Sequence, residues 1–154
     1  MILRNYEPKD SKNVVAFHEQ VLKDTGAFSP GPWNDDMLNI NEVYVRPGGL
    51  FVIVEDNGSL IGMGALKIIS EKEAEIKRMR VETTLQGKGI GQKIIDHLLS
   101  HAENKGIKRV ILDTTEAQKP AQNFYLKNGF KEYGQSIWNG LGLILYEKEL
   151  NISE

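Results

Sequence analysis

Three glycines stand at alternate positions in the segment QGKGIGQK, residues 86–93, where a strand pattern is followed by a helical one. A glycine in a helix interior costs about 1 kcal/mol relative to alanine, so three at one helix start need a physical reason. The N–H groups of a first helical turn are unpaired and positive, and glycine lets an anion approach them closely. The segment therefore predicts a phosphate-binding turn, to which Gln86 and Lys88 can add donors. A plain glycine-rich turn is the structural alternative.

Two common phosphate-binding patterns do not fit this segment. A P-loop requires Gly-Lys-Ser/Thr, whereas Lys88 is followed by Gly89. The dinucleotide fingerprint finds its first two glycines in Gly87 and Gly89, and Asp113 follows at roughly its usual spacing of about 20 residues. Its third glycine position, however, holds Gln92, and the preceding strand is charged rather than continuously apolar.

The rest of the chain predicts helices and strands mixed around one sheet. The dipeptide at 57–58, Asn-Gly, favours positive φ at both positions and is typical of a two-residue hairpin turn. The 154 residues suit one domain, 1–154, with an α/β fold in the α+β sense of a mixed sheet. Helices are expected after residue 10 and at 34–45, 90–105 and 120–129, and strands at 2–6, on both sides of the hairpin turn, and at 71–82, 107–115 and 141–150.

The strand before the glycines carries an irregularity in its alternation. Ala74 and Ile76 are two residues apart, and so are Met79 and Val81, but the pattern slips by one residue between the pairs. An extra residue in one strand of a pair produces such a slip, so we expect a β-bulge at residues 77–78. The alternative is a solvated edge strand with loose patterning.

Composition excludes several classes of chemistry. The chain has no cysteine, which rules out disulfides, thiolate catalysis and cysteine zinc sites. The formal net charge of −2 gives no argument for nucleic acid as a partner. His97 and His101 are spaced as helical zinc ligands can be, but the usual glutamate is missing, so we favour a solvated helix face and expect no metal. No apolar run approaches the ~18 residues of a membrane helix, and the polar start is unlike a signal peptide, so we expect no membrane partner and a cytoplasmic location.

Two motifs in this order resemble those of the GNAT superfamily of acetyl-CoA-dependent N-acetyltransferases. The segment QGKGIG, residues 86–91, matches the family's Q/R-x-x-G-x-G/A pattern, and residues 75–92 are similar to its central motif throughout. AQNFYLKNGF, residues 121–130, resembles its second signature. The resemblance covers most of the chain from the hairpin to residue 130, and it implies the GNAT fold, a splayed mixed sheet flanked by helices.

The resemblance also implies where acetyl-CoA binds as the co-substrate. The strand at 74–81 would separate from the strand at 108–114, and the pantetheine arm would lie in the gap against main-chain groups. The pyrophosphate would sit on the amides of residues 87–92. The cofactor-binding residues implied in this way are Met79, Arg80, Val81, Gln86, Gly87, Lys88, Gly89, Ile90, Gly91, Gln92, Gln118 and Asn123, although the family often has asparagine where this chain has Gln118.

Three catalytic roles follow from the same resemblance. A lysine-like amine has a pKa near 10.4, and neutralising it at pH 7 costs roughly 4–5 kcal/mol. Glu75, eleven residues before Gln86 like the catalytic glutamate of histone-type members, is the candidate base, directly or through water. A main-chain N–H near Met79 would stabilise the developing oxyanion. Tyr125 is similar in position to the family's general-acid tyrosine.

Each catalytic assignment has an alternative. Glu75 can be a surface charge on an alternating strand, with Glu82 and Asp113 as weaker candidate bases. Many members of the family use a water chain and no single base. Tyr125 can be a core aromatic residue beside Phe124.

Charged residues could border the acceptor site. Negative charge there would draw a cationic amine, although helix-start charges and solvated strand ends are the favoured interpretation. The acidic candidates are Asp35, Asp36, Glu71 and Glu73, and the basic ones, which could bind an acceptor carboxylate or the CoA phosphates, are Lys77, Arg78 and Arg80. The basic residues are too few to imply nucleic acid.

The leading interpretation is an acyltransferase. It would move an acetyl group from acetyl-CoA to a primary amine of a small molecule, amino acid or peptide by direct attack in a ternary complex. The alternative from another class is a non-catalytic acyl-CoA sensor or regulatory module. A third is a structural partner protein that uses an exposed last strand. The resemblance is also compatible with a homodimer.

Overall fold

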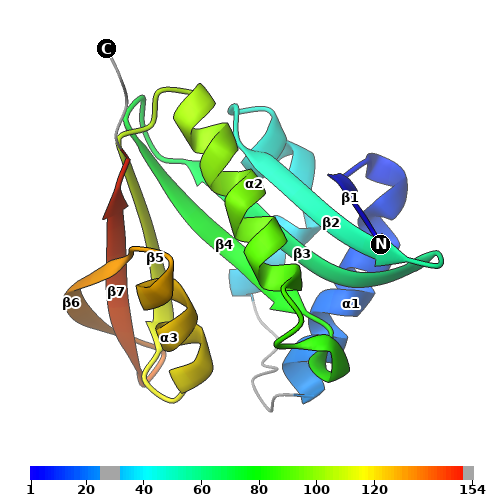
Figure 1. Ribbon diagram of the computed structural model, residues 1–154. Coiled ribbons are helices and arrows are strands. Elements are labelled where there is room, and N and C mark those ends of the chain that lie inside the picture. The colour runs from blue at the N-terminus through cyan, green and yellow to red at the C-terminus, as the bar shows by residue number, and fades with distance from the viewer. Residues whose placement is uncertain (25–31, 151–154) are drawn as a thin grey trace.

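The computed structural model describes residues 1–24 and 32–150, which hold a seven-stranded mixed sheet in the order β1-β2-β3-β4-β5-β7-β6 (Figure 1). Every neighbouring pair is antiparallel except β4 and β5. The expected fold class is confirmed. The strands are β1 (Ile2–Asn5), β2 (Leu50–Asp56), β3 (Ser59–Ile68), β4 (Glu73–Val81), β5 (Arg109–Thr115), β6 (Lys131–Trp138) and β7 (Leu141–Glu149). The α-helices are α1 (Ser11–Asp24), α2 (Ile90–Asn104) and α3 (Lys119–Lys127), and short helices are η1 (Pro8–Asp10), η2 (Pro32–Leu38), η3 (Asn41–Val45) and η4 (Thr83–Leu85).

Helices cover both faces of the sheet (Figure 1). On one face α2 crosses β3 and β4, and its apolar stripe is buried as its spacing predicts. A Cβ added at Gly64 of β3 would lie 2.5 Å from Ile94 Cγ2, so glycine there allows α2 to approach the sheet closely. On the other face α1, η2 and η3 pack against Phe51, Ile53 and Met63. Within residues 1–24 and 32–150 no helix is long and apolar enough to cross a membrane.

The predicted hairpin and bulge are both present. Asn57 and Gly58 have φ values of 51° and 81° in the turn between β2 and β3. The register between β3 and β4 shifts so that Arg78 and Met79 both stand opposite Gly64, and Arg78 takes a φ of 60°. The extra residue keeps the apolar side chains of β4 on the α2 face. In an unbroken alternation the two arginines of β4 would point into that core instead.

The region expected as one helix, residues 34–45, is instead two short helices, the 3-10 helix η2 and the π-helix η3. Asn39 interrupts the run, because its side chain donates to the carbonyl oxygen of Asp35 at 3.0 Å. Asparagine competes in this way with regular backbone pairing. Within this region Met37, Ile40 and Tyr44 are buried, whereas Leu38 is 69% exposed.

The expected exposure of the last strand was wrong. β7 lies between β5 and β6 and pairs with both, so β6 is the edge strand at this end of the sheet. The chain returns through a hairpin at residues 139–140 and inserts its last strand inside the sheet. A partner could therefore add a strand at β6 but not at β7.

Candidate functional site

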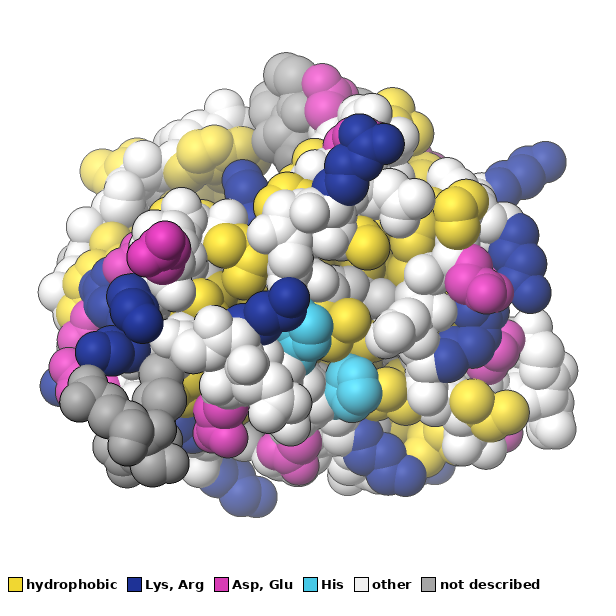
Figure 2. All heavy atoms as spheres, turned by 90° about the horizontal axis from the view of Figure 1, so that it is seen from above, with side chains coloured by type: hydrophobic (Ala, Val, Ile, Leu, Met, Phe, Trp, Pro, Cys, Tyr) yellow, Lys and Arg dark blue, Asp and Glu magenta, His cyan; other side chains and the backbone are white. Residues whose placement is uncertain are grey.

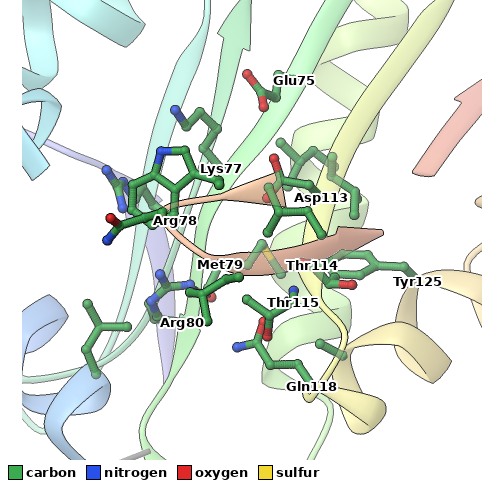
Figure 3. Close-up of a pocket in the computed structure, with 18 of the residues that line it drawn as sticks. Glu75, Lys77, Arg78, Met79, Arg80, Asp113, Thr114, Thr115, Gln118 and Tyr125 are labelled. Carbon is green, nitrogen blue, oxygen red and sulfur yellow. Dashed lines mark hydrogen bonds between the residues drawn. The ribbon is translucent and has the colours of Figure 1, made fainter. Parts of the chain in front are cut away.

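A cleft of about 650 Å³ opens where β4 and β5 separate (Figure 3). The parallel pairing covers Glu73–Glu75 of β4 and Arg109–Ile111 of β5, and no later ladder pair joins these strands within the described residues. The bulge bends β4, whereas β5 stays paired with β7 along its length. The two strands therefore diverge, as the resemblance implied, and leave main-chain groups of β4 facing an open space.

Two carboxylates line the cleft, Glu75 from β4 and Asp113 from β5 (Figure 3). Burial raises the pKa of Glu75 above its ordinary 4.5, and the charge of Asp113 adds to the rise while Lys77 opposes it. Although Asp113 keeps contact with solvent, the cleft walls raise its pKa as well. In the described part of the chain neither carboxylate has a hydrogen bond or ion pair, so each can accept a proton from a bound molecule.

Tyr125 is both a buried aromatic residue and a lining residue of the cleft. Its ring is buried, with edge-on contacts to Phe124 and Phe130 at centroid distances of 5.3 and 5.8 Å. The same residue lines the cleft from α3. Burial raises the pKa of its hydroxyl to about 12, against an opposing effect of the Arg80 charge. The hydroxyl is therefore protonated at neutral pH, as a general acid must be.

The glycine segment forms an open turn ahead of α2. Gly87 and Gly89 have φ values of 81° and 85°, and a Cβ added at either would meet nothing within 4 Å. Gly89 is the N-cap of α2 and no side chain caps the helix there. Gly91 lies in the first turn, where an added Cβ would touch Phe124 at 3.6 Å. The first-turn N–H groups are thus accessible to an anion.

Several residues implied as cofactor contacts have side chains engaged elsewhere. The Gln92 amide donates to Asp96 at 2.8 Å and to Asn128 at 2.7 Å, which ties α2 to the end of α3. Ile90 is buried in the core. These two residues can offer an anion their main-chain N–H groups, but not their side chains.

Other implied contacts divide between the cleft and the surface. Gln118 lines the cleft, and its Oε1 accepts from the N–H of Thr115 at 3.2 Å. Asn123 is exposed on α3 and is not a lining residue of the cleft. Lys88 is exposed in the turn, and Gln86 donates to the carbonyl oxygen of Val81 at 3.3 Å.

Two of the four acidic residues considered for the acceptor site are paired within the protein. Asp36 accepts from Arg78 at 2.5 and 2.9 Å and from the Tyr44 hydroxyl at 2.5 Å. Burial opposes ionisation of Asp36, but these hydrogen bonds outweigh it and hold its pKa below the ordinary 3.8. Glu73 pairs with Arg109 at 2.8 Å. Both carboxylates therefore have structural partners, but Asp36 is a mostly buried ion-pair partner and not the solvated charge expected from the sequence.

Asp36→Asn should destabilise the protein by about 2 kcal/mol, because it removes the carboxylate charge that Asp36 presents to the mostly buried Arg78. The native contribution of this pair is present above the unfolded pKa of Asp36, and it should be lost as the pH falls below about 4. Urea denaturation at pH 7 and pH 3 measures both effects. Glu42→Gln, which removes the exposed pair with Arg46, is the control and should cost under about 0.5 kcal/mol. Equal losses in the two variants would contradict the assignment.

The β6–β7 hairpin and α1 also form walls of the cleft, which no sequence motif indicated. Trp138, Asn139 and Leu141 line it from the turn, and Leu22 lines it from α1. His18 of α1 is buried beside this wall, and its Nε2 lies 3.0 Å from Asn34 Oδ1. Burial lowers the pKa of His18 to about 4, so it is neutral. The sequence signal that could have indicated this wall is the position of His18 within the apolar stripe of its helix.

The two spaced histidines have different surroundings. His97 is exposed, and His101 Nε2 donates to the carbonyl oxygen of Gly48 at 3.0 Å. Figure 2 shows histidine side chains at the molecular surface, next to a lysine or arginine side chain. Across residues 1–24 and 32–150, no group of three or more His, Asp or Glu side chains could hold a metal ion.

Comparison with known protein families assigns this chain. The model described as "Acetyltransferase (GNAT) family" matches residues 18–130. This chain belongs to the GNAT family. The domain is 30% identical over 110 residues to N-acetyltransferase 8B of Homo sapiens, across 68% of this chain and 48% of that protein. The chain therefore spans about half the length of that relative. It likewise covers 58% of N-acetyltransferase 8F1 of Rattus norvegicus and 53% of N-acetyltransferase 8F1 of Mus musculus.

Solved structures share the GNAT fold of this chain. An acetyltransferase from Streptococcus agalactiae superposes with a TM-score of 0.87 and 24% identity, over 97% of this chain and 98% of that one. PaiA N-acetyltransferase from Thermoplasma acidophilum, in complex with coenzyme A, superposes with a TM-score of 0.76 and 20% identity, over 97% and 98%. At these identities the likeness establishes the fold.

Proposed function

We propose that this GNAT domain transfers the acetyl group of acetyl-CoA to a primary amine by direct attack in a ternary complex. One observation carries the proposal: Glu75 and Tyr125 line the same cleft, in the opening between β4 and β5. The open glycine turn follows β4 directly. The coenzyme A complex of a neighbour with this fold and the names of the relatives support the same function.

The residues present suit an acyl-CoA. The turn at 87–89 offers accessible N–H groups and open space for a pyrophosphate, and Lys88 can add a positive charge. The diverging strand edge of β4 offers main-chain groups of Met79 and Val81 to a pantetheine arm. Gln118 lines the cleft and can contact the same arm.

The proposed chemistry assigns one task to each group. Acetyl-CoA supplies the thioester carbonyl carbon that the neutral amine attacks. Glu75 accepts the amine proton, and its raised pKa makes it a better base than an exposed glutamate. The N–H of Met79 donates to the carbonyl oxygen as negative charge develops on it. As the C–N bond forms and the C–S bond breaks, Tyr125 donates its proton to the sulfur, helped by the nearby Arg80 charge.

The competing function is an acyl-CoA sensor without turnover. Isothermal titration with acetyl-CoA, followed by a free-thiol release assay over a panel of amines, separates the two. Binding together with thiol release that depends on an added amine supports the enzyme. Binding with no thiol release from any amine would favour the sensor.

Glu75→Gln should lower kcat roughly 100-fold, because the amide cannot accept the amine proton. In the native protein kcat should fall as the pH drops through the raised pKa of Glu75, and the variant should lack this acidic limb. A pH profile at saturating amine measures both. Glu103→Gln, an exposed position on α2, is the control and should behave as the native protein. A full acidic limb in Glu75→Gln that disappears in Asp113→Asn would move the base to Asp113.

A further inference from the structure

Three cationic side chains of β4 line the cleft, Lys77, Arg78 and Arg80, and their surroundings differ. Arg78 is balanced by the carboxylate of Asp36. Arg80 donates from Nη1 to the carbonyl oxygen of Met79 at 2.8 Å. Its Nε is fully buried and has no hydrogen-bond partner in the described part of the chain. Arg80 is therefore a guanidinium at the cleft wall with a neutral acceptor and an unused donor.

The charge of Arg80 persists at neutral pH despite its surroundings. Burial lowers the pKa of Arg80 to about 10, and the neighbouring Arg78 charge acts in the same direction. A buried cation without a counter-ion is unfavourable, and an unsatisfied donor adds to the cost. An anionic ligand in the cleft would supply the missing negative charge.

Strand alternation places Arg80 away from the phosphate-binding turn. Its neighbours Met79 and Val81 pack on the face covered by α2, the helix whose first turn the glycines begin. Arg80 points to the opposite face, where Leu22 of α1 and Asn34 of η2 also line the cleft. In Figure 3, Arg78 and Arg80 lie on one side of β4 and Tyr125 lies on the other. This position suits the acceptor better than the CoA phosphates.

We infer that Arg80 binds a carboxylate of the acceptor, so that the substrates are amino acids or closely related acidic amines; this inference rests on the proposed function. The planar fork of a guanidinium matches a carboxylate with two parallel hydrogen bonds. Arg80 directly follows Met79, whose N–H is assigned to the thioester oxygen, so amine and carboxylate must be separated by a short spacer. An α-amino acid meets this condition. Glu75 lies five residues earlier on the strand, so with the carboxylate at Arg80 it would accept the amine proton through intervening water rather than directly.

Matched acceptor pairs test the carboxylate site. Glycine and glycinamide, and aspartate and its diamide, should be compared by thiol release at equal concentrations of neutral amine. The acids are expected to have kcat/KM values at least roughly tenfold above the amides. In Arg80→Gln, kcat/KM for the acids should fall roughly 10- to 100-fold, and the acid-to-amide ratio should approach one. Arg80→Lys should retain part of the preference for acids over amides, since lysine keeps the positive charge but lacks the planar guanidinium that forms two parallel hydrogen bonds.

The acid-to-amide ratio of kcat/KM separates recognition of the carboxylate from a general effect of Arg80 on catalysis. Arg80 also acts on Tyr125, so a fall in kcat common to acids and amides is expected in addition and does not count as recognition. Lys12→Gln, which removes an exposed positive charge near the start of α1, is the control and should leave the ratio unchanged. Circular dichroism and acetyl-CoA titration verify that each variant is folded.

The outcomes distinguish this inference from the function on which it rests. A native preference for acids that disappears in Arg80→Gln supports the carboxylate site. Turnover of amides as fast as acids by the native protein, or a preference for acids that survives in Arg80→Gln, overturns the site and leaves the acetyltransferase function standing. Acetyl-CoA binding with no thiol release from any amine overturns both. If Arg80→Gln does not fold, the native ratio and Arg80→Lys decide the question.

Discussion

Gly89→Glu is expected to abolish acetyl-CoA binding. Gly89 caps α2 with a φ of 85°, and open space lies where its side chain would begin. A carboxylate there would occupy the place proposed for the pyrophosphate and repel it. At a separation of about 4 Å near a protein surface such a repulsion amounts to several kcal/mol, so the affinity should fall at least roughly 1,000-fold. Isothermal titration calorimetry measures this directly.

Gly58→Glu is the matched control for that variant. Gly58, in the turn between β2 and β3, has a φ of 81° and likewise nothing within 4 Å of an added Cβ. Both substitutions impose a similar backbone strain, roughly 1–2 kcal/mol, so the free energies of unfolding should fall alike. Only Gly89→Glu should lose acetyl-CoA. Native affinity in Gly89→Glu would count decisively against the phosphate-binding turn.

Tyr125→Phe is expected to lower kcat by roughly 100- to 1,000-fold while leaving the affinity for acetyl-CoA nearly unchanged. Phenylalanine keeps the ring contacts with Phe124 and Phe130, so the packing of α3 should be preserved. Because the pKa of Tyr125 is about 12, its hydroxyl is protonated across the ordinary assay range. The loss of rate should therefore be constant between about pH 6 and pH 9. Stopped thiol-release assays across that range measure it.

Tyr146→Phe tests whether any buried tyrosine would have the same effect. Tyr146 of β7 is buried in the same core but does not line the cleft. Its replacement should leave kcat within about twofold of the native value, with at most a small loss of stability. A comparable fall in kcat for Tyr125→Phe and Tyr146→Phe would indicate a packing defect rather than the loss of a proton donor.

Local backbone features that depend on a few neighbouring residues can be predicted from the sequence alone. Asn57 and Gly58 occupy positive φ in the hairpin turn, as their own preferences require. The one-residue slip between Ile76 and Met79 predicts the bulge, because side chains of a strand alternate strictly between its two faces. The glycine turn is similar, since only glycine accepts such dihedrals without strain. Each of these signals is carried by the residues that adopt the conformation.

The walls of the cleft, by contrast, depend on contacts between distant parts of the chain. Asp36 pairs with Arg78, which is 42 residues away in the sequence. Because of this pairing, Asp36 is a structural carboxylate and no longer a candidate for acceptor binding. The same pairing balances the charge of one arginine of β4. Trp138 reaches the cleft only because β7 inserts between β5 and β6.

The sequence by itself thus predicts a hairpin at residues 57–58, a bulge at 76–79 and an anion-accepting turn at 86–91. Each prediction follows from the dihedral or alternation preferences of those residues. The distinction between Arg78 and Arg80 had no such local source, since both are arginines on one face of one strand. The distinction arises from the neighbour that each arginine contacts after folding. Arg78 contacts a carboxylate of η2, whereas Arg80 contacts a neutral carbonyl group and lines the open cleft. Side-chain partnership depends on how separate elements assemble, and charge alone does not specify it.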